Sequence, residues 1–182
     1  MKRNIILWQL IGFGVIVVGG VLLHFLYDWS GEAIWMAPFS SVNESTWEHM
    51  KILFFPMLIF AIIQSFFFKE YKKFWDIKLK GIIIGILLIP LLFYFYNGVI
   101  GKSPDWINIA IFVISIAVSI FYEIKQFKKK EVQNDKSIQS LFILIMIAAL
   151  FIVFTFAPLE LEIFKDPTTG LYGINNFIVL NI

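Results

Sequence analysis

The chain has 182 residues, of which 59% are hydrophobic and 15% charged, whereas a soluble domain is about 45–50% apolar and about 25% charged. No single soluble core of this length hides 21 phenylalanines, so the composition excludes a soluble globular protein. The absence of cysteine excludes disulfides and thiolate sites, and the net charge of +2 does not suggest a nucleic-acid partner.

Five apolar runs follow one another, and each predicts a transmembrane helix. The first, 5–26, has the roughly 20 residues needed to cross the hydrocarbon layer and is too long for a signal peptide. Backbone groups in lipid must bond internally, so the runs are helices. The other four runs are 50–68, 81–96, 106–122 and 138–156. We therefore predict an all-α polytopic bundle of five spans, forming a single membrane domain over 1–182.

Lysine and arginine predict the orientation, because cytoplasmic loops carry the excess of these residues. Twelve of the fifteen fall on the side of the N-terminus, and Lys51, Lys102 and Lys165 fall on the other. The interpretation is N-terminus in and C-terminus out, in the plasma membrane, with membrane lipid as the expected partner and protein partners unspecified. The predicted segments are inner loops 69–80 and 123–137, outer loop 27–49 and outer tail 157–182.

The outer segments carry the unusual residues. His24 lies where the first span leaves the hydrocarbon, with Asp28 one turn later on the same helix face. His49 enters the membrane boundary opposite His24, so both histidines of the chain lie at the same depth. Either histidine simply finds a hydrogen bond at the interface, or the pair contributes to a site.

The segment before the second span suggests a helix start. Ser45 and Glu48 fit a capping box, in which each side chain accepts a hydrogen bond from the other's backbone N–H. Glu44 and Glu48 are like charges one turn apart, which is unfavourable unless a cation or proton lies between them. Glu44 is therefore a candidate ligand.

The tail contains the turn sequence Asp166-Pro167-Thr168-Thr169-Gly170, with glycine where a positive φ is needed. Tyr172 and Asp166 return near the same headgroup layer as Glu160. The candidate catalytic residues are therefore Glu44, Glu48, Asp166 and Tyr172. The candidate metal ligands are His24, His49, Glu44 and Glu160, and a divalent metal is the only cofactor suggested.

Three blocks, taken in order, carry a resemblance. They are His24-Phe25-x-Tyr27-x-Trp29-Ser30-Gly31, Val42-Asn43-Glu44-Ser45-Thr46-Trp47-Glu48-His49 and Phe164-x-Asp166-Pro167-Thr168-Thr169-Gly170-x-Tyr172-Gly173. The chain resembles the small bacterial membrane proteins of the family called domain of unknown function 6512. The resemblance implies no activity. It places Glu160, within Pro158-Leu159-Glu160, where the family pattern has histidine, a replacement that a metal site tolerates better than a proton shuttle does.

Three classes of function remain open, and the sequence does not decide whether the protein is an enzyme. The first is a membrane protein without catalytic activity, whose outer loop and tail form a polar cap on the bundle. The second is a metal-dependent hydrolase or transferase acting on a lipid or envelope precursor at the outer leaflet. The third is a small transporter or channel subunit, which the absence of a charged mid-membrane residue and of an inverted repeat disfavours.

Overall fold

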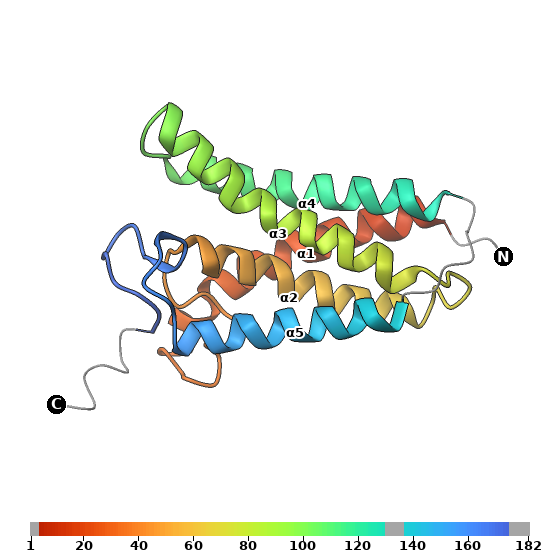
Figure 1. Cartoon of the computed structure of the whole chain (residues 1–182), viewed down its shortest axis with the longest axis horizontal. Helices are drawn as coiled ribbons and strands as arrows, with labels where there is room; N and C mark the ends of the chain where they lie inside the picture. The colour runs from red at the N-terminus through yellow and green to blue at the C-terminus, as the bar shows by residue number, and fades with distance from the viewer. Residues whose placement is uncertain (1–3, 130–136, 175–182) are drawn as a thin grey trace.

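The computed structural model describes residues 4–129 and 137–174, and it is an all-helical bundle (Figure 1). Residues 130–136 of the predicted inner loop 123–137 and residues 175–182 of the predicted outer tail lie outside the described part of the chain. The elements are α1 Ile5–Trp29, α2 Thr46–Ser65, α3 Phe74–Val99, α4 Asp105–Phe127, α5 Ser137–Phe156 and a short 3₁₀ turn, η1, at Glu162–Phe164. The predicted fold class is confirmed.

All five α-helices are long and apolar enough to cross a membrane, as in a multi-pass membrane protein. Most helix ends lie beyond the predicted runs, because polar residues at a span's ends continue the helix beyond the hydrocarbon. The exception is the end of α2, which stops at Ser65 although the predicted run continues to 68. The largest difference is at α3, which begins at Phe74, so 74–80 is helical and not loop. α2 and α3 continue through Pro56 and Pro90, as expected where neighbouring helices support a span.

α2 occupies the centre of the bundle. It has the lowest hydropathy of the five candidate spans and yet is the most buried, because the other helices surround it. Its residues Leu53, Phe54 and Met57 lie in the main core with Ile116 of α4 and Phe151 of α5. Polar groups on α2 are thus enclosed by protein and not by lipid.

α3 and α4 diverge from the other helices at the end opposite the N-terminus (Figure 1). There α3 leaves Leu91, Phe95 and Val99 more than 60% exposed, as expected for lipid-facing side chains. We call the end that carries His24 and His49 the histidine end, and the end that carries the α2–α3 turn the lysine end. The described part of the tail lies at the histidine end (Figure 1).

Candidate functional site

α1 and α2 pack closely as an antiparallel pair, and this contact brings the two histidines together. A Cβ at Gly12 would lie 2.5 Å from the Phe60 ring, so only glycine permits this approach. His24 follows Gly12 by twelve residues and His49 precedes Phe60 by eleven, which puts them at one level. Their ring centroids are 5.4 Å apart.

Glu44 completes a three-residue cluster at the histidine end. Its Oε2 lies 3.6 Å from His24 Nε2 and 3.6 Å from His49 Nε2. One ligand atom from each residue lies within 4.8 Å of the others. The side chains are 26% (His24), 20% (His49) and 46% (Glu44) exposed, so solvent reaches the cluster from one side.

The hydrogen bond made by His49 fixes which ring nitrogen faces the cluster. His49 Nδ1 lies 2.9 Å from the Ser45 backbone oxygen. A carbonyl oxygen only accepts, so Nδ1 carries the proton and Nε2 of the neutral ring offers its lone pair toward Glu44. Metal-binding histidines commonly have such a second contact. Among the described residues, His24 Nδ1 is buried without a hydrogen-bond partner. Of the two imidazole rings, therefore, His49 is oriented by a hydrogen bond at Nδ1 and His24 is not.

The cluster favours an ionised carboxylate at Glu44. The interaction with the His24 imidazole is the largest influence on the pKa of Glu44 and lowers it, whereas burial and the charge of Asp166 oppose this effect. Glu44 is therefore anionic at neutral pH. An anionic oxygen beside two imidazole nitrogens is a donor set for a divalent transition metal.

The loop that carries Glu44 is fastened at both ends. Ser45 caps α2 by accepting a hydrogen bond from Glu48 N at 3.4 Å, which is half of the predicted capping box. The other half is wrong, because Ser45 N donates to Asn43 Oδ1 instead. Asn43 Nδ2 donates to Gly173 O in the tail at 3.0 Å, so loop and tail hold one another.

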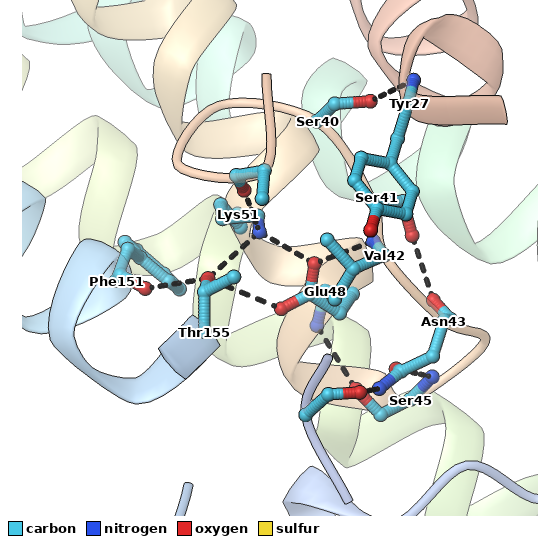
Figure 2. A network of polar contacts seen from close by, with 12 residues as sticks. Tyr27, Ser40, Ser41, Val42, Asn43, Ser45, Glu48, Lys51, Phe151 and Thr155 are labelled. Atoms are coloured by element: carbon cyan, nitrogen blue, oxygen red, sulfur yellow. Dashed lines mark hydrogen bonds and ion pairs between the residues drawn. The ribbon is translucent and has the colours of Figure 1, made fainter. Parts of the chain in front are cut away.

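Glu48 turns inward into a buried network (Figure 2). Its Oε2 pairs with Lys51 Nζ at 2.5 Å and accepts from Val42 N at 3.0 Å. Lys51 Nζ also donates to Ala37 O at 2.9 Å and to Thr155 Oγ1 of α5 at 2.8 Å. The network joins α2, α5 and both ends of the 37–42 segment just before Glu44. Lys51, which counts toward the outer side in the prediction of orientation, is fully buried and points into the bundle.

The two glutamates one turn apart therefore have different surroundings. Glu48 is 2% exposed and paired with an ammonium group, whereas Glu44 faces the histidines. No shared cation is needed to relieve repulsion between them. Glu48, predicted as a catalytic candidate, has its carboxylate enclosed and occupied, which favours a positioning role.

The tail folds over the histidine end through the predicted turn. Asp166 accepts hydrogen bonds from Thr168 N, Thr168 Oγ1 and Thr169 Oγ1 at 2.6–2.9 Å. Burial raises the pKa of Asp166, but these hydrogen bonds together lower it below its ordinary value. Gly170 has φ +74°, as predicted. Tyr172 pairs through its backbone with Lys165.

We expect Asp166→Ala and Gly170→Ala each to destabilise the protein by about 1–2 kcal/mol, through lost hydrogen bonds and a strained left-handed residue respectively. Thermal unfolding in mild detergent measures this. Because the folded pKa of Asp166 is lowered, its contribution is complete above the unfolded value of about 3.9 and disappears as pH falls through the folded value. Thr168→Ala is the smaller, graded control, and unchanged melting of all three variants would contradict this role of the turn.

Comparison with protein families decides the relationship suggested by the sequence blocks. The model of a family of unknown function (DUF6512) matches residues 1–174. The chain belongs to this family. No curated protein and no solved structure matches it.

In this DUF6512 protein, the structure groups three of the four predicted metal ligands and leaves out the fourth. It brings His24, Glu44 and His49 together. Glu160, which the family resemblance places at a histidine position, is exposed and lies outside this group. Asp166 is near enough for its charge to affect Glu44, but its own oxygens are bonded within the turn.

A second polar cluster, at the lysine end, was missed by sequence reasoning. Glu123 Oε2 pairs with Lys78 Nζ at 2.5 Å and accepts from Gln9 Nε2 at 2.7 Å. All three residues are 0–2% exposed. The sequence analysis counts Lys78 among loop lysines, which is wrong because α3 begins one turn earlier. A signal was present: Gln9, Lys78 and Glu123 each lie about one turn inside a helix end.

Gln64 lies at the same level as this cluster. It follows Phe60 by four residues, while Gln9 precedes Gly12 by three, so the α1–α2 register puts them opposite each other. Its amide is fully buried with no hydrogen-bond partner among the described residues. Within the part of the chain that the structure describes, the Gln64 amide therefore makes no hydrogen bond to a neighbouring helix.

Proposed function

We propose that this multi-pass membrane protein binds one divalent transition-metal ion through His24, Glu44 and His49. The observation that carries the proposal is the convergence of two imidazoles and a carboxylate from α1, α2 and the loop between them, with ligand atoms within 4.8 Å of one another. Two histidines and a glutamate form one of the ligand sets of zinc enzymes.

The spacing of the donor atoms suits a tetrahedral ion. Metal–ligand bonds of about 2.0–2.2 Å at tetrahedral angles separate neighbouring ligand atoms by about 3.3 Å. The two distances of 3.6 Å from Glu44 to the histidines are a few tenths of an ångström longer, and all three ligand atoms lie within 4.8 Å of one another. Binding an ion would therefore draw the side chains, and above all the two imidazoles, closer together. Imidazole donors favour zinc-like ions over magnesium or calcium, which prefer oxygen.

Zn²⁺ titration of the purified protein tests the proposal, followed by calorimetry or tryptophan fluorescence. We expect one ion per chain. His49→Ala or Glu44→Ala should weaken binding by more than the about 10–100-fold that is typical of changes to residues that contact a ligand but not the metal. Glu160→Ala is the matched control, because it removes an exposed carboxylate at the same end and should leave binding unchanged. Equal binding by wild type and Glu44→Ala would contradict the proposal.

A second candidate function is metal-dependent hydrolysis at the membrane surface. Three protein ligands leave one position open, and Glu44 is 46% exposed, so water and substrate can approach. A metal-bound water in such a site has a pKa of about 7. Lipid esters or phosphoesters presented in vesicles are the substrates to test. Turnover that requires added Zn²⁺ and disappears in His49→Ala would support this function.

The orientation of the chain belongs to the same proposal. We infer that the histidine end faces outward across the plasma membrane, because twelve of fifteen basic residues fall at the opposite side. In cells, a membrane-impermeant maleimide should label cysteine introduced at Lys102 or Thr168 and spare cysteine at Lys129, all exposed positions. The reverse labelling pattern would place the metal site inside.

A further inference from the structure

A pocket of about 360 Å³ lies at the lysine end, away from the histidines, between the α2–α3 turn and the start of α5. Ser65 ends α2, Trp75 lies in the first turn of α3 and Ser137 begins α5, and all three line it. The Trp75 N–H donates to Ser137 Oγ at 3.3 Å. This hydrogen bond holds the two helix starts together and shapes one wall.

The floor of the pocket is aromatic and well packed. Phe68 and Phe74 line it and are only 1% and 4% exposed. Their ring centroids are 6.2 Å apart, and Tyr71 lies 5.4 Å from Phe68. Because these rings also pack against Phe127 of α4, the floor belongs to the folded core, and the pocket does not have to form when a ligand arrives.

The rim of the pocket is positively charged. Lys69 and Lys72 line it and are exposed, and no carboxylate of the described residues lines it, although Glu70 lies between the two lysines in the same turn. The acid nearest along α3, Asp76, is paired with Lys80 at 2.8 Å. Two lysines that line the same pocket as aromatic rings and serine hydroxyl groups suit a phosphate attached to a less polar body.

The position of the pocket relates it to lipid. It lies where α2, α3 and α5 end or begin, at the level at which tryptophan and tyrosine meet headgroups. Beside it, Phe66, Ile138 and Phe142 are 65%, 85% and 63% exposed. In a membrane these side chains contact acyl chains. A lipid with its phosphate in the pocket can therefore lay its chains along this surface.

We propose that the pocket formed by the α2–α3 turn and the start of α5 binds the headgroup of an anionic phospholipid, with Lys69 and Lys72 contacting the phosphate. The site is separate from the metal cluster, which lies at the other end of the bundle, and neither proposal depends on the other. The volume of the pocket is near the lower limit of about 300 Å³ for small-molecule sites, and it admits a phosphate with a glycerol.

The test compares lipids and variants in mild detergent by thermal unfolding and by native mass spectrometry. Phosphatidylglycerol should raise the melting temperature of the wild type and remain bound at one molecule per chain, whereas phosphatidylcholine should do neither. The double variant Lys69→Gln/Lys72→Gln should bind phosphatidylglycerol about 30-fold more weakly, from about five-fold per lysine. Lys128→Gln/Lys129→Gln is the matched control, because it removes the same charge at the same end outside the pocket.

Three results would overturn this inference. Equal weakening by the two double variants would show diffuse attraction to basic surface charge and not a pocket. Equal stabilisation by phosphatidylcholine would remove the requirement for an anionic lipid. Equal stabilisation of the wild type by glycerol 3-phosphate would assign the pocket to a soluble phosphate. The last two comparisons use only the wild type, so they decide the matter even if a variant folds poorly.

Discussion

Lys78→Met is expected to destabilise the protein by about 3–5 kcal/mol, the typical cost of removing one partner of a buried ion pair. The change leaves the Glu123 carboxylate fully buried, with the Gln9 amide as its one hydrogen-bond donor among the residues that the structure describes. Methionine has a similar length, so packing against the Phe60, Phe74 and Phe127 rings near the ammonium changes little. Thermal or denaturant-induced unfolding in detergent measures the loss.

The double variant Lys78→Met/Glu123→Gln tests the physical reason. It removes both charges while retaining an oxygen that accepts from Gln9, so we expect most of the stability to return. Lys80→Met is the matched single control, since Lys80 is exposed on the same helix and pairs with Asp76 near the surface. A double variant as unstable as Lys78→Met would show that the charge pairing does not cause the loss.

Lys51→Met is expected to lower both stability and metal affinity. By the same reasoning as for Lys78, it should cost about 3–5 kcal/mol, because Glu48 remains buried without its ammonium partner. Ala37 also loses its hydrogen-bond donor, which loosens the segment preceding Glu44. We expect Zn²⁺ affinity to fall about 10–100-fold, as for changes that support metal ligands without touching the metal. Zn²⁺ titration of the folded fraction at low temperature measures this.

Two further variants separate support of the site from general stability. Lys51→Met/Glu48→Gln should recover stability, but not all of the affinity, because the donor to Ala37 is still missing. Lys102→Met removes an exposed lysine at the same end and should change neither quantity. Unchanged Zn²⁺ affinity in Lys51→Met would mean that the network stabilises the bundle without positioning Glu44.

The fold was predictable because, along each span, lipid requires every backbone N–H and C=O group to be hydrogen-bonded within the protein. Long apolar runs with internally bonded backbones identify helices without knowledge of their neighbours. Helix ends were less predictable, as at Phe74, because the polar residues beyond the hydrocarbon do not mark where a helix stops. The common depth of His24 and His49 followed from the same helices and was predicted, whereas the contact between their rings depends on how α1 and α2 pack and was left open by the sequence.

The interior polar contacts were not predictable from one sequence. In a sequence, a lysine one turn inside a helix is interpreted as an anchor at the membrane interface. Only the contact with Glu123 shows that Lys78 points into the bundle. Glu44 and Glu48 look equivalent in sequence, but Glu48 lies on the central helix α2 and is buried, whereas Glu44 lies in the loop before the Ser45 cap and is 46% exposed. Such assignments depend on packing between helices, which span hydropathy does not encode.

The most direct measurement is elemental analysis of the protein purified in mild detergent without chelator, beside His24→Ala and His49→Ala prepared in the same way. We expect about one transition-metal ion per chain in the wild type and a large loss in both variants, with all three proteins folded. Metal content that is the same in all three, or a wild type that neither retains nor takes up Zn²⁺, would contradict it. His24, Glu44 and His49 would then form a hydrogen-bonded cluster that closes the histidine end of the bundle.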